Sequence, residues 1–197
     1  MAALDIATLA NQIRDVMARS DDPKVITAEV AELAKPYAAD MSWVEPRCHE
    51  TDEGQGIGIM VFHEDPDPGL LIETVSWLPG RGVQPHDHQT WGVVIGLEGR
   101  ECNVTWRRRD QGARPGYAEL EKAAEVDVTN GDIVCLMPDD IHSVRNDGQE
   151  LSMSLHIYGR GLAYTGRSEF DPIANIQRPC PWLLYTSPSP RDGETQR

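Results

Sequence analysis

The sequence predicts a mainly β protein, a sandwich or small barrel preceded by two α-helices. Three observations favour this fold class. Apolar side chains in the first 36 residues recur at three- and four-residue steps, the spacing of amphipathic helices. From Met41 onward, short β-like runs alternate with Gly, Pro, Asn and Asp. The length of 197 residues is enough for one domain with a substantial core.

Two segments at the start of the chain are expected to be helical. The first covers residues 5–18, where Ile6, Leu9 and Ile13 share one face. The second begins at Asp22-Pro23, which supplies an N-cap and a proline at the first helical position, and is expected to stop before Pro36.

The β-like region is divided by turn signals such as Pro79-Gly80 and Asn130-Gly131. The expected strands are residues 58–63, 70–78, 92–97, 101–108, 117–120, 124–128, 132–136, 142–146 and 151–158. The domain organisation is a helical appendage at 1–40 and a barrel at 41–182. Residues 183–197 resemble the translation of a sequencing adapter, and we expect this tail to be non-native.

Composition excludes several classes of function. The net charge of −14 repels phosphate backbones, so nucleic acid is not an expected partner. No run of about 18 apolar residues is present to cross a membrane. The four cysteines are scattered without a CxxC pair, and the first 17 residues lack the pattern of a signal peptide. A cytoplasmic location is therefore expected.

Two stretches carry candidate metal ligands. In His86-Asp87-His88, alternation along an extended chain places both imidazoles on one side. Taken alone, such a pair is more often two half-exposed histidines on an edge strand of a sheet. Here it lies between Gly80 and Gly99, close to the first motif of cupin barrels, and the stretch from Asn130 to His142 resembles the second motif.

The carboxylate ligand of the common cupin motif is missing, because Gly92 and Val93 stand where a Glu is usual. Three neutral imidazoles leave the full charge of a divalent metal at the site. That charge favours an anionic ligand such as a thiolate. Both Zn²⁺ and Fe²⁺ accept three-histidine sets, so the spacing does not choose the metal.

A third stretch, Ser154-Leu155-His156-Ile157-Tyr158, alternates polar and apolar side chains. Alternation places Ser154, His156 and Tyr158 on one face of a strand. The row either lines a barrel interior, where its groups need partners, or faces solvent as ordinary polar residues.

Taken together, these stretches resemble the cysteine dioxygenase type I superfamily, the thiol dioxygenases, over residues 56–170. The resemblance implies a cupin barrel with N-terminal helices and a non-haem Fe(II) cofactor held by His86, His88 and His142. It implies a reaction that adds both atoms of O₂ to a small thiol to give a sulfinic acid. Ser154, His156 and Tyr158 would be the catalytic hydrogen-bonded row, with Tyr158 aimed at substrate and oxygen.

Within this family, the chain is most similar to the bacterial 3-mercaptopropionate dioxygenase branch. It has no Cys near Gly92 to crosslink the tyrosine, and Arg167 follows Tyr158 by nine residues. In that branch this arginine is associated with the substrate carboxylate, which a guanidinium binds in a bidentate pair. The alternative is a surface ion pair of Arg167 with Glu169 or Asp171.

The substrate stays open among thiol acids, including 3-mercaptopropionate, mercaptosuccinate and cysteine-like thiols. Both branches carry an Arg or Gln on the strand before the His-Asp-His segment, whereas the nearest amide here is Gln55. Two other classes compete with a dioxygenase: a cupin isomerase or hydrolase using zinc or manganese, and a non-catalytic cupin that binds a small ligand. The oligomeric state is open, with a monomer as one option.

Overall fold

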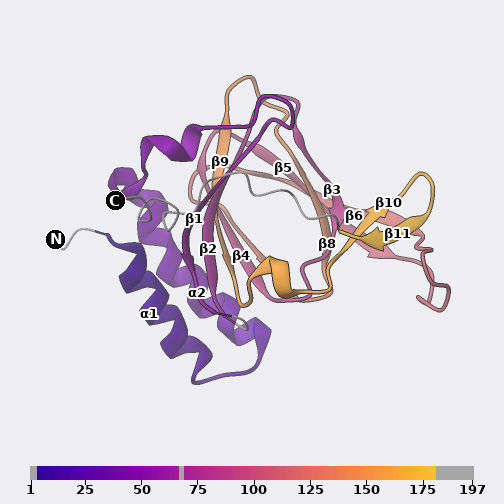
Figure 1. Ribbon diagram of the computed structural model, residues 1–197, viewed down its shortest axis with the longest axis horizontal. Helices are drawn as coiled ribbons and strands as arrows, with labels where there is room; N and C mark the ends of the chain where they lie inside the picture. The colour runs from indigo at the N-terminus through magenta and orange to yellow at the C-terminus, as the bar shows by residue number, and fades with distance from the viewer. Residues whose placement is uncertain (1–3, 67–68, 181–197) are drawn as a thin grey trace, which may run out of the picture.

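The computed structural model describes residues 4–66 and 69–180, and the expected tail at 183–197 lies outside them. Two helices come first and eleven strands follow within the described residues (Figure 1). The helices are α1 (Ile6–Met17) and α2 (Pro23–Ala39), with short 3-10 helices η1 (Met41–Trp43), η2 (Pro46–His49) and η3 (Leu162–Tyr164). The strands are β1 (Ile57–Glu64), β2 (Leu71–Trp77), β3 (Gly82–His86), β4 (Gly92–Glu98), β5 (Glu101–Arg108), β6 (Leu120–Val128), β7 (Ile133–Leu136), β8 (Ile141–Arg145), β9 (Ser152–Tyr158), β10 (Ser168–Asp171) and β11 (Ile176–Pro179).

The strands form two antiparallel sheets that face each other. One sheet has the order β1-β2-β9-β4-β7 and the other β11-β10-β3-β8-β5-β6. From β2 to β10 the chain passes repeatedly between the two sheets, which is the topology of a double-stranded β-helix. The predicted fold class, a mainly β cupin barrel with two N-terminal helices, is confirmed.

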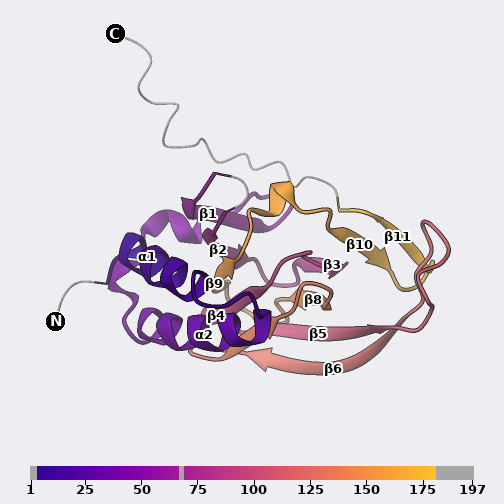
Figure 2. The ribbon, with the colours of Figure 1, turned by 90° about the horizontal axis from the view of Figure 1, so that it is seen from below.

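The two helices cover the outer face of the sheet that contains β9 (Figures 1 and 2). Their apolar faces and one face of β2, β4 and β9 form a single buried cluster. Its fully buried strand members are Ile72, Val93, Ile95, Met153, Leu155 and Ile157. Because side chains alternate along a strand, the residues between them point to the interior of the barrel. This packing fixes which residues of these strands line the interior.

The second helix, α2, begins at the predicted cap but ends later than predicted. Asp22 accepts a hydrogen bond from the Lys24 amide at 2.9 Å. The helix then continues through Pro36 to Ala39, although a proline inside a helix removes one hydrogen bond. Tyr37, just past the proline, is buried, and its hydroxyl donates to the Asp5 carbonyl at 2.8 Å. These contacts offset the bond that Pro36 lacks.

Several strand predictions were incomplete. Strands β3, β10 and β11 were not predicted, because each is only four or five residues long and none alternates regularly in burial. The expected strand at 117–120 is wrong, since Tyr117 makes only an isolated bridge to Ile176. The expected strand at 124–128 instead begins at Leu120, on the largely exposed edge strand β6, where charged residues hide the strand pattern.

No helix within the described residues is long and apolar enough to cross a membrane.

Asn146, directly after β8, is predicted to be essential for closing this end of the barrel. It is fully buried, and its side-chain amide donates to the carbonyls of Trp77 (2.9 Å) and Glu150 (2.8 Å). Asn146→Ala leaves these acceptors unpaired, so we expect the free energy of unfolding to fall by about 2–4 kcal/mol. Urea denaturation measures it, with Glu53→Ala in an exposed turn as the control. A loss below about 0.5 kcal/mol would contradict this role.

Candidate metal centre

Three histidines meet inside the barrel, two on paired strands of one sheet and one just after the first of these strands. His86 ends β3 and is paired with His142 of β8, and His88 follows two residues later. Asp87, between the first two, anchors this segment to β10. Its carboxylate accepts from the Ser168 amide at 2.8 Å, and its own amide donates to the Ser168 carbonyl at 3.1 Å. One side-chain and one backbone hydrogen bond of Asp87 therefore hold the segment between the two histidines against β10.

The three imidazoles are close enough to share one ion. One ring nitrogen from each lies within 4.8 Å of the others, and the Nε2 atoms of His86 and His88 are 3.1 Å apart. All three side chains are buried. Nδ1 of His88 and Nε2 of His142 are buried without a hydrogen-bond partner. The orphaned Nε2 of His142 fits a site that holds a metal, because the metal would satisfy a nitrogen that the protein leaves unpaired.

Burial keeps these imidazoles neutral. It lowers the pKa of His86 to about 4 and holds the pKa values of His88 and His142 well below the usual value, with neighbouring histidines adding to the shift. Neutral imidazole is the form that ligates metals. The Nδ1–H of His86 can donate to the Gln84 carbonyl at 2.9 Å, which leaves Nε2 free as a ligand. The described residues thus contain a possible three-histidine metal site, with the identity of the metal undetermined.

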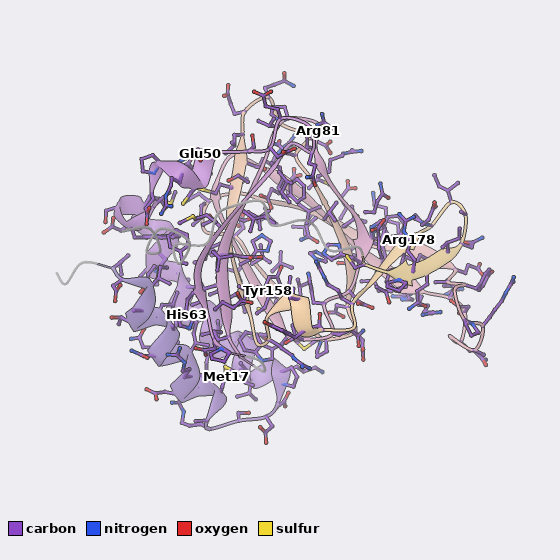
Figure 3. All side chains as sticks on the ribbon, viewed as in Figure 1. Met17, Glu50, His63, Arg81, Tyr158 and Arg178 are labelled. Atoms are coloured by element: carbon purple, nitrogen blue, oxygen red, sulfur yellow. The ribbon has the colours of Figure 1, made fainter. Side chains whose placement is uncertain are left out.

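The predicted polar row on β9 faces the barrel interior and is hydrogen-bonded along its length. Ser154 Oγ lies 2.9 Å from His156 Nε2, and His156 Nδ1 lies 2.8 Å from the Tyr158 hydroxyl. The Tyr158 ring is 4.8 Å from the His88 ring, centroid to centroid. Figure 3 shows Tyr158 between the two sheets, near η3. The solvent-facing alternative is therefore wrong, since all three side chains are buried.

Gly92 of β4 is paired with Tyr158 across the sheet. A Cβ atom on Gly92 would lie 3.0 Å from two carbons of the tyrosine ring, so a larger side chain there would press on the ring. No thiol occupies this position. The absence of a crosslinking cysteine, noted in the sequence, thus coincides with close packing of the tyrosine on a glycine.

A small cavity of about 50 Å³ joins the histidines to the polar row. Its apolar walls include Ile59, Val75 and Val144, and its polar lining includes Glu73 and Arg167. A cavity of this size admits only a small ligand. Gln55 is exposed in the turn before β1 and is not among the residues that line it.

Glu73 of β2 was missed by sequence reasoning. It is buried, and its carboxyl makes no hydrogen bond among the described residues. Burial raises its pKa to about 8, against the opposing effect of Arg167. The only signal in the sequence was one acidic residue within an otherwise buried strand, and that signal does not reveal which face it occupies.

Arg167 lies at the junction of this cavity and an outer groove. It lines both, and the groove also contains Arg178 and Cys180. The surface alternative placed Arg167 against Glu169 or Asp171. Glu169 pairs instead with Arg178 at 2.6 Å, and Arg167 makes no ion pair within the part of the chain that the structure describes.

No family model and no curated protein matches the chain. Among solved structures it is similar to a double-stranded β-helix protein from Klebsiella pneumoniae, with a TM-score of 0.49 and 14% identity over 65% of this chain and 91% of that one. It is also similar to a cupin superfamily protein from Desulfitobacterium hafniense (TM-score 0.43, 17% identity, 61% and 93% covered) and to oxalate oxidase in complex with glycolate (0.44, 13%, 61% and 60%). These likenesses concern the barrel and assign no reaction to this chain.

We expect replacement of any of the three clustered histidines by Ala to weaken metal binding strongly. Loss of a direct ligand should exceed the roughly 10–100-fold cost of losing an outer partner. Titration of metal-free protein with Fe²⁺ under anaerobic conditions, and with Zn²⁺, measures the affinity. His49→Ala, a surface histidine beside Glu98, is the matched control. Equal affinity of the control and the site variants would contradict a shared site.

Glu73→Gln is expected to change how stability depends on pH. The folded-state pKa of about 8 lies above the ordinary 4.5 of Glu, so the folded protein keeps a proton that the unfolded chain releases. Stability of the natural protein therefore falls as pH rises from about 4.5 to about 8. Relative to the natural protein, the free energy of unfolding of Glu73→Gln should therefore rise by up to about 1.4 kcal/mol per pH unit across this window.

Urea denaturation of the metal-free proteins at several pH values measures this difference. Glu53→Gln, in an exposed turn, is the control and should leave the pH profile unchanged. Parallel profiles for the natural protein and Glu73→Gln would show that Glu73 titrates normally.

Proposed function

We propose that this protein is a non-haem iron(II) thiol dioxygenase. It converts a small mercapto-carboxylic acid, such as 3-mercaptopropionate or a cysteine-like thiol, and O₂ to the sulfinic acid (R–SH + O₂ → R–SO₂H). The observation that carries the proposal is the buried row of Ser154, His156 and Tyr158, which ends against the ring of His88. A metal site that only stored or sensed an ion would not need a buried hydrogen-bonded row directed at it.

The proposed ligands are His86, His88 and His142. Bound there, iron(II) would supply the redox chemistry and the Lewis acidity that lowers the pKa of a thiol. The ligand set adds no negative charge of its own, because the imidazoles are neutral and no carboxylate belongs to the cluster. An anionic thiolate is therefore the substrate form that best complements the site.

The remaining residues bind and orient the substrate. Arg167, which lines both the cavity and the outer groove, would take a substrate carboxylate in a bidentate pair. The apolar walls accept the short carbon chain, and the small volume excludes bulky thiols. Tyr158 holds a proton at its phenolic oxygen, and His156 fixes the position of that hydroxyl through the 2.8 Å contact. All the oxidising equivalents of O₂ enter the product, so no external reductant is needed.

Oxygen uptake by anaerobically iron-loaded protein tests the proposal. Separate samples receive 3-mercaptopropionate, L-cysteine, cysteamine and mercaptosuccinate, and mass spectrometry identifies the product. One sulfinate formed per O₂ consumed is the expected result, with Tyr158→Phe keeping its iron but turning over more slowly. Iron binding without oxidation of any thiol would contradict the proposed function. Catalytic activity that depends on bound zinc or manganese, and not on iron, would favour an isomerase or hydrolase.

Arg167→Ala is expected to raise the KM for carboxylate-bearing thiols by about 10–100-fold, the cost of losing a charge-assisted pair. The KM for cysteamine, which has no carboxylate, should change far less. Arg178→Ala is the matched control, because Arg178 lies on the β10–β11 hairpin and pairs with Glu169 (Figure 3). An equal rise for all thiols would show that Arg167 supports the fold and does not recognise the carboxylate.

A further inference from the structure

Three acidic side chains are buried among the described residues: Glu73, Asp87 and Glu101. The protein itself supplies hydrogen bonds to two of them. Asp87 accepts from the Ser168 amide at 2.8 Å, and Glu101, the first residue of β5, accepts from the Ser154 hydroxyl at 3.0 Å. Glu73 differs, because its Oε2 atom is buried without a hydrogen-bond partner. A buried carboxyl oxygen without a partner is costly, so Glu73 is a candidate for binding a ligand.

Glu73 faces the cavity beside the three clustered histidines. It lines this cavity together with Val75, which shares its face of β2. Opposite Glu73 in the ladder is His156 of β9, whose two ring nitrogens lie against Ser154 and Tyr158. Those contacts occupy both nitrogens, so His156 does not pair with the Glu73 carboxyl. A ligand in the cavity is therefore the partner that can reach it.

Arg167 lines the same cavity and carries the opposite charge. Glu73 belongs to the sheet that contains β9, whereas Arg167 directly precedes β10 of the other sheet. The positive charge of Arg167 opposes the rise in the pKa of Glu73, but within the described part of the chain no ion pair joins the two side chains. A ligand that pairs with both needs a cationic donor toward Glu73 and an anion toward Arg167.

We propose that Glu73 binds an ammonium group of the substrate, and that the substrate is an aminothiol carboxylic acid, the class to which cysteine belongs. This assignment rests on the proposed function and selects among the thiol acids that it leaves open. The thiolate faces the histidine cluster, the carboxylate pairs with Arg167, and the ammonium group pairs with Glu73. The amino group is unchanged by the oxidation, so Glu73 acts in substrate recognition.

The electrostatic surroundings of Glu73 favour a cation as its partner. Burial raises the pKa of Glu73 to about 8, and the nearby negative charge of Glu64 adds to this rise. Both effects penalise a carboxylate that stands alone, and a bound cation offsets the penalty by supplying the opposite charge. A thiol acid without an amino group, such as 3-mercaptopropionate, brings only negative charge to the cavity and leaves Glu73 without a partner.

Ligand binding to zinc-loaded and metal-free protein tests the proposal without turnover. Isothermal titration calorimetry at neutral pH, in the absence of O₂, compares three thiols. Among them, 3-mercaptopropionate carries only the carboxylate, cysteamine only the ammonium group, and L-cysteine both. We expect Glu73→Gln to weaken binding of L-cysteine and cysteamine by about 10–100-fold, the cost of losing a charge-assisted pair, and to leave 3-mercaptopropionate nearly unchanged.

Arg167→Ala is the matched control, because it removes the other charge that lines the cavity. It should weaken L-cysteine and 3-mercaptopropionate and spare cysteamine, the reverse of the pattern expected for Glu73→Gln. Circular dichroism and zinc affinity show whether each variant is folded. Glu73→Met, which is neutral and of similar length, should reproduce the pattern of Glu73→Gln and takes its place if that variant does not fold.

Two results would overturn the proposal. Unchanged affinity for L-cysteine and cysteamine in a folded Glu73 variant would show that the amino group binds elsewhere, for example to the metal itself. Equal weakening of all three thiols would show that Glu73 supports the shape of the cavity and does not recognise the ammonium group.

Turnover by iron-loaded protein separates this proposal from the dioxygenase assignment. If thiols are oxidised, the KM for L-cysteine should rise about 10–100-fold in Glu73→Gln, with kcat near that of the natural protein. Selective loss of aminothiol binding, without oxidation of any thiol, would keep the ammonium site and remove the proposed function. Oxidation with the same change in KM for L-cysteine and 3-mercaptopropionate would remove the ammonium site and keep the function.

Discussion

The alternation of side chains along β9 is the constraint on which the rest of the structure depends. Leu155 and Ile157 pack beneath the two helices, and this packing forces Ser154, His156 and Tyr158 into the barrel. A register slip of one residue would exchange the two sets, placing three polar groups in the apolar cluster. The apolar cluster therefore determines the chemistry of the interior, although none of its members contacts a ligand in the arrangement we propose.

Sequence reasoning located the parts of the site that depend on local spacing. The His86 and His88 pair and the row on β9 follow from a period of two, which needs no knowledge of the partner strands. Arg167 was found through resemblance to a family and not through spacing. The short strands β3 and β10 that hold the histidine segment were missed, because pairing with neighbours stabilises them more than their own pattern does.

Glu73 and Glu101 could not be found in the same way. Each is a single acidic residue in a strand, and such residues usually face solvent. Their burial depends on contacts between elements: Glu73 lies opposite His156 in the neighbouring strand, and Glu101 reaches Ser154 across the barrel. Both contacts join segments more than fifty residues apart in the sequence. Only the fold brings these residues together, so the contacts of Glu73 and Glu101 with the polar row depend on tertiary structure and not on local sequence spacing.

The location of unpaired polar atoms gives a physical reason to place ligand binding in the cavity between the three clustered histidines and the polar row on β9. Each buried polar atom without a partner costs about 1–3 kcal/mol. Among the described residues, such atoms include Oε2 of Glu73, Nδ1 of His88 and Nε2 of His142, all from residues that line one cavity. Most buried polar groups elsewhere, such as Asn146, are satisfied by the protein itself. A ligand that pairs with these atoms recovers part of the cost of folding, which couples occupancy of the cavity to stability of the barrel.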